Sequence, residues 1–236
     1  MVSIKNAATF LVLAAGAGVG ALVVGPVAGK VLLGWAGCCY AVVAVAYAAG
    51  RPGIFLKRPS GGLPAAAWLL FGPFLLPNAA CFHAYRLLAG EAPWHEVAPG
   101  VYLGRRLTGR EAARAAPADL AGVVDLTCEL PEPAAMRGCG EYLNLPVLDG
   151  TCPTPGRLRE AVAFIERVRP AGGVYVHCAV GHGRSATVAV AWLLAAGLAG
   201  SAGEALARVR SRRPRARLAY GGAAAVEEFL RARDPT

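Results

Sequence analysis

The chain has 236 residues, enough for one or two domains, and its 24 Lys and Arg against 15 Asp and Glu give a formal net charge of +9. All 15 acidic residues lie in residues 91–236, whereas residues 1–90 contain none and only six basic residues. The seven cysteines form no C-x-x-C pair and no Cys/His cluster at zinc spacing, which excludes a structural zinc site and a dithiol oxidoreductase. The sequence therefore predicts an apolar anchoring region, residues 1–90, before a polar domain, residues 91–236.

Two uncharged apolar runs, about residues 7–24 and 31–49, flank the turn sequence GPVAGK. Each has the roughly 18–20 residues that a helix needs to cross the hydrocarbon core of a bilayer. A cleaved signal peptide has a shorter apolar core and no second apolar run directly after it, and a pair of buried helices in a soluble protein is the other alternative. The runs predict two antiparallel transmembrane helices that pack through their Gly and Ala residues.

A third apolar run, about residues 64–82, carries no charge but is interrupted by Pro73 and Pro77. It either spans the membrane or lies in the interface as broken helices, and we expect the second. With two spans, only Lys30 lies on one side of the membrane. Four basic residues share the other side: Lys5, Arg51, Lys57 and Arg58. The positive-inside rule then predicts a multi-pass membrane protein whose polar domain faces the cytoplasm, where thiols stay reduced.

The polar domain alternates strand and helix patterns. The predicted strands are a short strand after a turn in Glu96–Gly104, a buried strand in Ala121–Thr127, a short strand and loop in Glu141–Gly150, and a buried strand in Val174–Cys178. One predicted helix begins at Pro155, and three more run from Arg184 to Ala196, from Ser201 to about Ser211, and from about Tyr220 to Arg233. This alternation predicts an α/β fold with a central mixed sheet that helices cover on both faces.

The stretch VYVHCAVGHGRSAT, Val174 to Thr187, combines a strand, a glycine loop and a helix start. This arrangement binds anions, because a helix N-terminus offers unpaired N–H groups and a partial positive charge. Gly181 and Gly183 let successive N–H groups turn toward one point. A nucleotide-binding P-loop is excluded, since no lysine precedes Ser185.

Cys178 lies at the start of this loop. The dipole and N–H groups that bind an anion also stabilise a thiolate, and helix N-termini lower cysteine pKa values. Arg184 adds a permanent charge, and its planar fork can hold two phosphoryl oxygens. The loop therefore has the chemistry both to generate a nucleophile and to bind a phosphate.

HCAVGHGRSAT resembles the H-C-x5-R-[ST] signature of the cysteine-dependent protein tyrosine phosphatases, and is most similar to the dual-specificity branch. LPVLDGTCPTPGRLREAVAFIERV resembles that branch's acid loop and following helix, and ALARVRSRRPRARL resembles its later helix and Arg-Pro turn. The resemblance covers about Val97 to Leu230 and implies the fold of that branch.

The resemblance implies a metal-independent, cofactor-independent phosphatase. Cys178 would form a cysteinyl-phosphate, Ser185 would help the sulfur leave, and His177 would order the loop. The phosphate would be held by the loop and its arginine: Ala179, Val180, Gly181, His182, Gly183 and Arg184. Asp149, which follows the LNLPV strand, is the candidate for the acid that protonates the leaving oxygen. Asp125 is its rival, although it lies inside a strand pattern where a carboxylate is more often structural.

The substrate class stays open between a phosphoprotein and a phospholipid, since Ala179 and His182 replace basic residues that several lipid phosphatases carry. The basic run Arg208–Arg217 and the membrane anchor favour the lipid somewhat. We expect no nucleic-acid partner, and the oligomeric state is open. The alternative function is a catalytically inactive phosphate-binding module or scaffold at the membrane.

A thiolate at Cys178 also predicts sensitivity to oxidation. Cys128, which follows a core strand, and Cys152, three residues beyond Asp149, are the candidates for a redox partner. The alternative is that both are passive. A disulfide requires Cα atoms within about 7 Å of one another.

Overall fold

The computed structural model describes residues 2–233 and builds the polar domain around a five-stranded sheet. The strands are β1 (Trp94–Ala98), β2 (Val101–Arg105), β3 (Leu120–Thr127), β4 (Glu141–Val147) and β5 (Gly173–Cys178). Their order is β1-β2-β5-β3-β4, with β1 antiparallel to β2 and every other neighbouring pair parallel. This confirms the mixed sheet. Because the carboxyl ends of the parallel strands share one edge, the loops after β3, β4 and β5 converge there.

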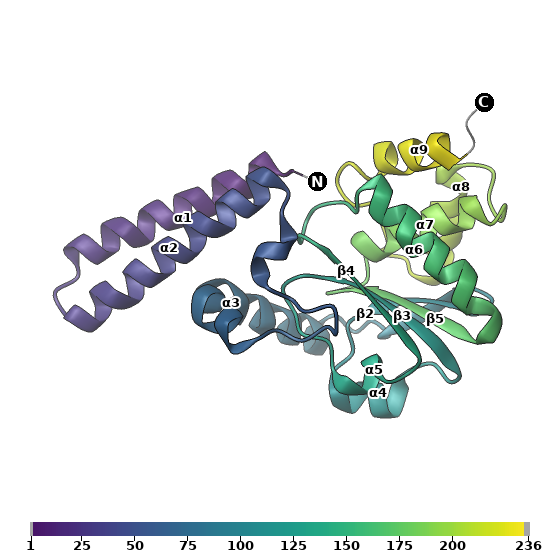
Figure 1. Cartoon of the computed structure of the whole chain (residues 1–236), viewed down its shortest axis with the longest axis horizontal. Coiled ribbons are helices and arrows are strands. Elements are labelled where there is room, and N and C mark those ends of the chain that lie inside the picture. The colour runs from purple at the N-terminus through teal and green to yellow at the C-terminus, as the bar shows by residue number, and fades with distance from the viewer. Residues whose placement is uncertain (1, 234–236) are drawn as a thin grey trace.

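Helices cover both faces of the sheet, as expected (Figure 1). One face carries α6 (Pro155–Val168), α7 (Arg184–Ala195), α8 (Ala202–Arg212) and α9 (Gly222–Arg233), which enclose the main apolar core with the strands. The other face carries α4 (Gly109–Ala115) and α5 (Ala134–Arg137) over a smaller core. A 3₁₀ turn, η2 (Arg169–Ala171), links α6 to β5. Central strand β5 is buried along its whole length, so its end is a rigid place for a site.

Two local predictions differ from the structure. The expected strand Glu96–Gly104 is a hairpin of two strands, because Pro99 and Gly100 turn the chain; Gly100 has φ +73°, and its N–H donates to Glu96 Oε1 at 2.9 Å. Helix α4 was not predicted. It begins at a capping box, in which Thr108 and Glu111 each accept from the other's backbone N–H.

Near the N-terminus, α1 (Ile4–Val23) and α2 (Val27–Ala49) form an antiparallel hairpin that projects away from the sheet (Figure 1). Both helices, and also α3 (Ala65–Leu88), are long and apolar enough to cross a membrane. No residue of α1 is buried. An apolar surface of this extent is suited to lipid, since water would penalise it. The three helices suggest association with a membrane.

The prolines do not break α3, so our expectation of broken helices is wrong, while the position of this segment relative to the membrane stays a prediction. A proline has no N–H for the carbonyl four residues earlier, which frees the carbonyls of Leu69 and Pro73. Two side chains of α2 replace the missing donors: Trp35 Nε1 donates to the Leu69 oxygen and Tyr40 Oη to the Pro73 oxygen, each at 2.9 Å. The helix therefore continues through both prolines to Leu88.

The segment between α2 and α3 joins the hairpin to the polar domain. Its 3₁₀ turn η1 (Pro52–Phe55) buries Phe55 against Phe71 and Phe74 of α3. The same apolar cluster includes Cys128 and Leu148 from the loops after β3 and β4. The anchor thus packs directly on the edge of the sheet where the loops converge.

Candidate active site

The loop from Cys178 to Arg184 connects the end of β5 to the start of α7, as the sequence predicted. Gly181 has φ +77°, and a β-carbon there would overlap the Gly104 carbonyl of β2, so the position requires glycine. The Gly181 N–H donates to Cys178 Sγ at 3.3 Å, and Ser185 Oγ donates to it at 3.4 Å. The loop is therefore wrapped around the sulfur.

These contacts change the ionisation of the thiol. Burial by itself raises the pKa of Cys178, but the charge of Arg184 and hydrogen bonds from Ser185 and Gly181 outweigh it, so the pKa is lowered from its usual value. The expected thiolate thus has a physical cause in this structure.

Arg184 is buried and held by carboxylates on two sides. Its Nη1 and Nη2 donate to both oxygens of Glu129 at 3.0 and 2.7 Å, and Nη1 also donates to the Val147 carbonyl at 2.8 Å. Glu129 was not identified as a site residue from the sequence. A carboxylate directly after a strand whose end faces the loop is the signal that points to it.

Asp149 lies in the turn after β4, and its Oδ1 is 2.9 Å from Arg184 Nη2. Its side chain is 57% exposed, in contrast to the buried guanidinium. Both residues line a pocket of about 210 Å³ together with Cys178, Val180, His182 and Gly183, and with Thr151, Gly150, Arg217, Ala219 and Tyr220. The structure therefore brings the predicted nucleophile, arginine and acid to one cavity.

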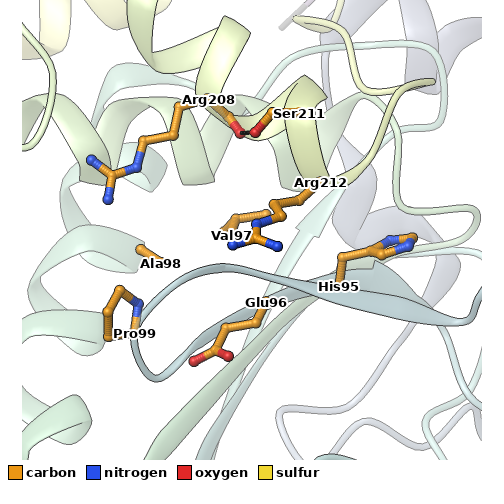
Figure 2. Close-up of a pocket in the computed structure, with 8 residues that line it drawn as sticks. All are labelled: His95, Glu96, Val97, Ala98, Pro99, Arg208, Ser211 and Arg212. Atoms are coloured by element: carbon orange, nitrogen blue, oxygen red, sulfur yellow. Dashed lines mark hydrogen bonds between the residues drawn. The ribbon is translucent and has the colours of Figure 1, made fainter.

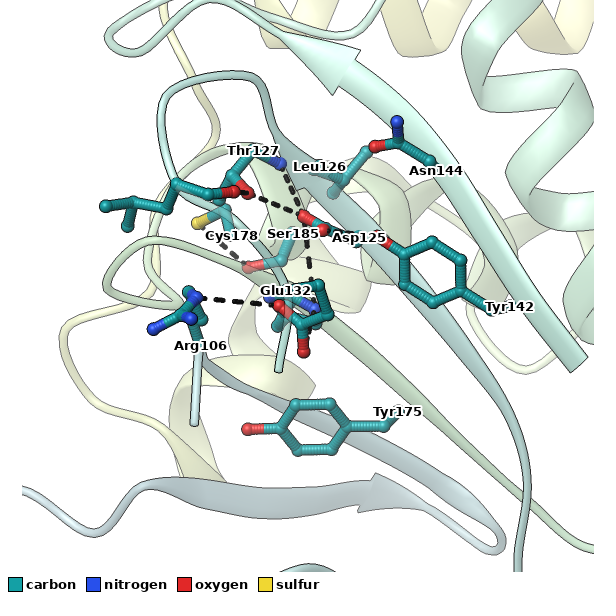
Figure 3. Close-up of polar contacts among 12 residues, drawn as sticks. Arg106, Asp125, Leu126, Thr127, Glu132, Tyr142, Asn144, Tyr175, Cys178 and Ser185 are labelled. Carbon is teal, nitrogen blue, oxygen red and sulfur yellow. Dashed lines mark hydrogen bonds and ion pairs between the residues drawn. The ribbon is translucent and has the colours of Figure 1, made fainter. Parts of the chain in front are cut away.

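Asp125, the rival acid, is fully buried in β3 away from that pocket (Figure 3). Lys57 Nζ donates to its Oδ2 at 2.5 Å and Tyr142 Oη at 2.7 Å, while Thr127 N–H donates to Oδ1 at 2.8 Å. Burial opposes the charge, but Lys57 dominates among the groups that keep the Asp125 pKa below its usual range. Its contacts are those of a structural carboxylate.

Beside Asp125 lie His177 and Glu132, and one ligand-type atom from each of the three residues lies within 4.8 Å of the others. Burial lowers the pKa of His177 to about 4 and raises that of Glu132 well above its usual range. A cation here would meet the charges of Lys57 and Arg106. Both oxygens of Asp125 already accept hydrogen bonds, from Lys57, Tyr142 and Thr127. The cluster does not fit a metal ion. Within the cluster, His177 directly precedes Cys178 at the end of β5.

Residues 101–224, just over half of the chain, match the family described as "Dual specificity phosphatase, catalytic domain". The chain belongs to the dual-specificity phosphatase family. Its domain is thus the catalytic domain of a cysteine-dependent phosphomonoesterase, and the expected fold class and enzyme class are confirmed.

The relatives support this assignment. Dual specificity protein phosphatase Mpk3 of Drosophila melanogaster is 34% identical over 128 residues, which cover 52% of this chain and 30% of that protein. Human dual specificity protein phosphatase 1 is 33% identical over 102 residues, covering 42% and 27%. The chain thus spans about a third of the length of these relatives.

Among solved structures, Tk-PTP in its active form matches with a TM-score of 0.52 and 35% identity, over 58% of this chain and 95% of that one. PTPMT1 in complex with PI(5)P matches with a TM-score of 0.54 and 23% identity, over 60% and 96%, and this likeness concerns the fold.

The anchor also contacts the phosphate loop of this phosphatase. His182 Nε2 is 3.3 Å from Tyr85 Oη in the last turn of α3, and 2.6 Å from Glu91 Oε2 in the loop after that helix. Arg213, buried after α8, donates to the carbonyls of Gly181 and Val180 at 2.8 and 3.0 Å. Glu91 and Tyr85 are thus structural partners of His182, while Arg213 is a structural partner of the loop backbone.

The basic run Arg208–Arg217 does not form one surface in the phosphatase. Arg213 is buried under the loop, and Arg217 lines the catalytic pocket. Arg208 and Arg212 instead face β1 across a separate pocket of about 430 Å³ (Figure 2). That pocket lies at α8, on the part of the domain far from the hairpin (Figure 1). The arginines of this run therefore lie in several parts of the domain and do not form one binding surface for an anionic partner.

The two candidate redox partners are buried free thiols. Burial and the neighbouring Glu129 raise the pKa of Cys128 well above its usual value, and burial raises that of Cys152 to about 12. Both are therefore protonated at neutral pH, which favours the alternative in which both are passive.

Proposed function

We propose that the protein is a membrane-anchored phosphomonoesterase that works through a cysteinyl-phosphate on Cys178. The observation that carries the proposal is the convergence of three groups on one pocket: a sulfur with a lowered pKa, the Arg184 guanidinium and the Asp149 carboxyl group. No one of these alone would suffice, because the reaction needs a nucleophile, charge stabilisation and a proton donor.

In the first step, the Cys178 thiolate attacks phosphorus, the bond to the leaving oxygen breaks, and Asp149 gives that oxygen its proton. The N–H groups of residues 179–183 and the Arg184 fork hold the phosphoryl oxygens while charge shifts. Asp149 must therefore exchange its ion pair with Arg184 for the substrate.

In the second step, the Asp149 carboxylate takes a proton from a water molecule whose oxygen attacks phosphorus. The sulfur–phosphorus bond breaks, and the hydroxyl of Ser185, 3.4 Å from the sulfur, stabilises the departing thiolate. His177, buried beneath the loop, keeps its backbone in place.

We further propose that the substrate phosphate is carried by a phospholipid in the cytoplasmic leaflet. The catalytic domain is packed on its anchor rather than tethered by a free linker, as the cluster of Phe55, Phe74 and Leu148 illustrates. A rigidly docked pocket reaches only groups at a fixed height above the bilayer. Lys5, Arg51 and Arg58 lie at the domain end of the hairpin and Lys30 at its tip, which supports the cytoplasmic orientation.

The test uses the full chain in lipid nanodiscs or mixed micelles and compares phosphoinositides, phosphatidylglycerophosphate, phosphopeptides and an aryl phosphate at equal phosphate concentration. We expect faster release from the lipids, unchanged by chelators, and no turnover by Cys178→Ser, which should still bind vanadate because the backbone cradle remains.

Three outcomes would contradict parts of the proposal. Faster release from phosphopeptides would replace the lipid by a phosphoprotein. Turnover by Cys178→Ser, or activity lost with chelator and restored by metal, would remove the cysteine mechanism. Failure to hydrolyse any substrate while vanadate still binds would leave an inactive phosphate-binding module.

A further inference from the structure

The transmembrane hairpin touches the acid loop through its backbone. The carbonyl oxygen of Asp149 accepts a hydrogen bond from Tyr47 Oη at 3.1 Å and another from Asn6 Nδ2 at 3.4 Å. Tyr47 lies near the end of α2 and Asn6 in the first turn of α1. The two helix ends are joined to each other, since Ser3 N–H donates to the Tyr47 carbonyl at 3.0 Å.

The Tyr47 hydroxyl is held in place by packing within the anchor. The tyrosine is only 3% exposed, and its ring stacks on Phe10 of α1 at 5.3 Å between centroids. Phe10 in turn meets the edge of Phe74 in α3 at 5.5 Å. All three anchor helices therefore determine where this donor points.

The acid loop is also held by its buried neighbours Leu148 and Thr151, and the Thr151 hydroxyl donates to the Leu148 carbonyl at 2.8 Å. Asp149 is followed by Gly150 at φ +70°, and the turn is closed by the Thr151 N–H on the Leu148 carbonyl at 3.1 Å. Within residues 2–233, the hydrogen-bond donors to the Asp149 carbonyl come only from the hairpin. The two donors hold the planar peptide unit between Asp149 and Gly150, and this restricts ψ of Asp149 and the position of its β-carbon.

We propose that Tyr47 and Asn6 are positioning residues for proton transfer, through which the membrane hairpin orients the carboxyl group of Asp149. The inference rests on the proposed function, in which Asp149 is the acid. The proton donor is then placed by the membrane anchor and the nucleophile by the sheet. Packing of the hairpin in a bilayer is thereby linked to the protonation of the leaving group.

The test compares Tyr47→Phe with Tyr40→Phe in the full chain, in nanodiscs of one lipid composition. Both changes remove one hydroxyl from α2, and both rings stack on Phe10, but Tyr40 donates to Pro73 inside the anchor. The substrates are a series of soluble phosphate esters, from acidic phenols to alkyl alcohols, because only basic leaving oxygens need the proton.

A displaced catalytic group can cost up to about 100-fold in rate, and loss of one of two hydrogen bonds should cost less. We expect Tyr47→Phe to lower kcat about tenfold for alkyl phosphates and less than about twofold for esters of acidic phenols, with KM unchanged. Asn6→Ala should act in the same direction more weakly, given its longer hydrogen bond. In an Asp149→Asn background, Tyr47→Phe should have no further effect on the leaving-group dependence.

The inference is overturned if Tyr47→Phe matches Tyr40→Phe, or if it slows all leaving groups equally, which is what a loss of folded protein would do. If Asp149→Asn itself leaves the leaving-group dependence unchanged, the acid is misassigned and both proposals fall. If Asp149→Asn shows the dependence and Tyr47→Phe does not, only the inference falls.

Discussion

Replacing Lys57 with methionine should destabilise the protein far more than removal of a surface charge. Lys57 lies between α2 and α3, yet its side chain is 1% exposed and reaches into the catalytic domain. Its ammonium donates to Asp125 Oδ2 at 2.5 Å, to the Thr127 carbonyl at 2.9 Å and to Thr127 Oγ1 at 2.8 Å. Methionine has a similar length and removes all three donors.

The expected loss follows from the carboxylate left behind. Removal of one partner from a buried pair costs about 3–5 kcal/mol. Asp125 can limit this cost by taking up a proton, which for an ordinary aspartate at pH 7 costs roughly 4 kcal/mol. The cost of breaking the pair and the cost of protonating Asp125 agree. For a chain of this size, a loss of about 3–5 kcal/mol corresponds to a melting temperature lower by about 6–20 °C.

The pH dependence supplies a second measure. In the wild type, Lys57 and the other partners of Asp125 together outweigh burial and lower its pKa. Above the unfolded pKa the group is therefore ionised in both states and adds no slope. In the variant, burial without the ammonium raises the folded pKa, so the native state binds more protons than the unfolded state. The variant should therefore lose stability as pH rises, and its deficit should shrink by up to about 1.4 kcal/mol per unit between pH 7 and pH 5.

The assay is thermal unfolding of the full chain in one detergent, with Arg58→Met as the matched control. Arg58 is the adjacent basic residue, is exposed, and should change stability by less than about 0.5 kcal/mol. A loss for Lys57→Met no larger than for Arg58→Met, or a deficit that stays constant with pH, would refute the buried-pair argument.

Three further predictions concern the thiols and α3. Inactivation by iodoacetamide should show a pH midpoint below that of an ordinary thiol, because Arg184 and Ser185 lower the pKa of Cys178. The Ser185→Ala change should move this midpoint upward, and an unchanged midpoint would contradict the role of Ser185. Peroxide should drive Cys178 mainly to sulfinic and sulfonic forms, since Cys128 and Cys152 are protonated, and a disulfide to either one in mass spectra would show the opposite. Trp35→Phe should lower the free energy of unfolding in detergent by about 1 kcal/mol, because the Leu69 carbonyl loses its donor. In a Pro73→Ala background the cost should be much smaller, since the restored backbone N–H satisfies that carbonyl. Equal costs of Trp35→Phe in the two backgrounds would argue against the proposed compensation.

The sequence by itself determined the elements whose signals are local. The apolar runs indicated the helices of the hairpin, since spanning length and lack of charge are properties of a single segment. The strand, glycine loop and helix around Cys178 were likewise predictable, because the loop chemistry needs residues at fixed spacing. Asp149 was found through the resemblance of its loop, and the structure places it in the pocket with Arg184.

The tertiary structure decided what depends on distant segments. The bonds from Lys57 to Asp125 and from Tyr47 to Asp149 join residues 68 and 102 positions apart, and no periodicity in either segment records such a pairing. Glu129 became a partner of Arg184 only because β3 and β5 end at one edge of the sheet. The prolines of α3 indicated a break by local rules, and α2 overrode them by supplying hydrogen-bond donors. A buried polar group is satisfied by whichever partner the fold brings near, and sequence spacing does not contain that information.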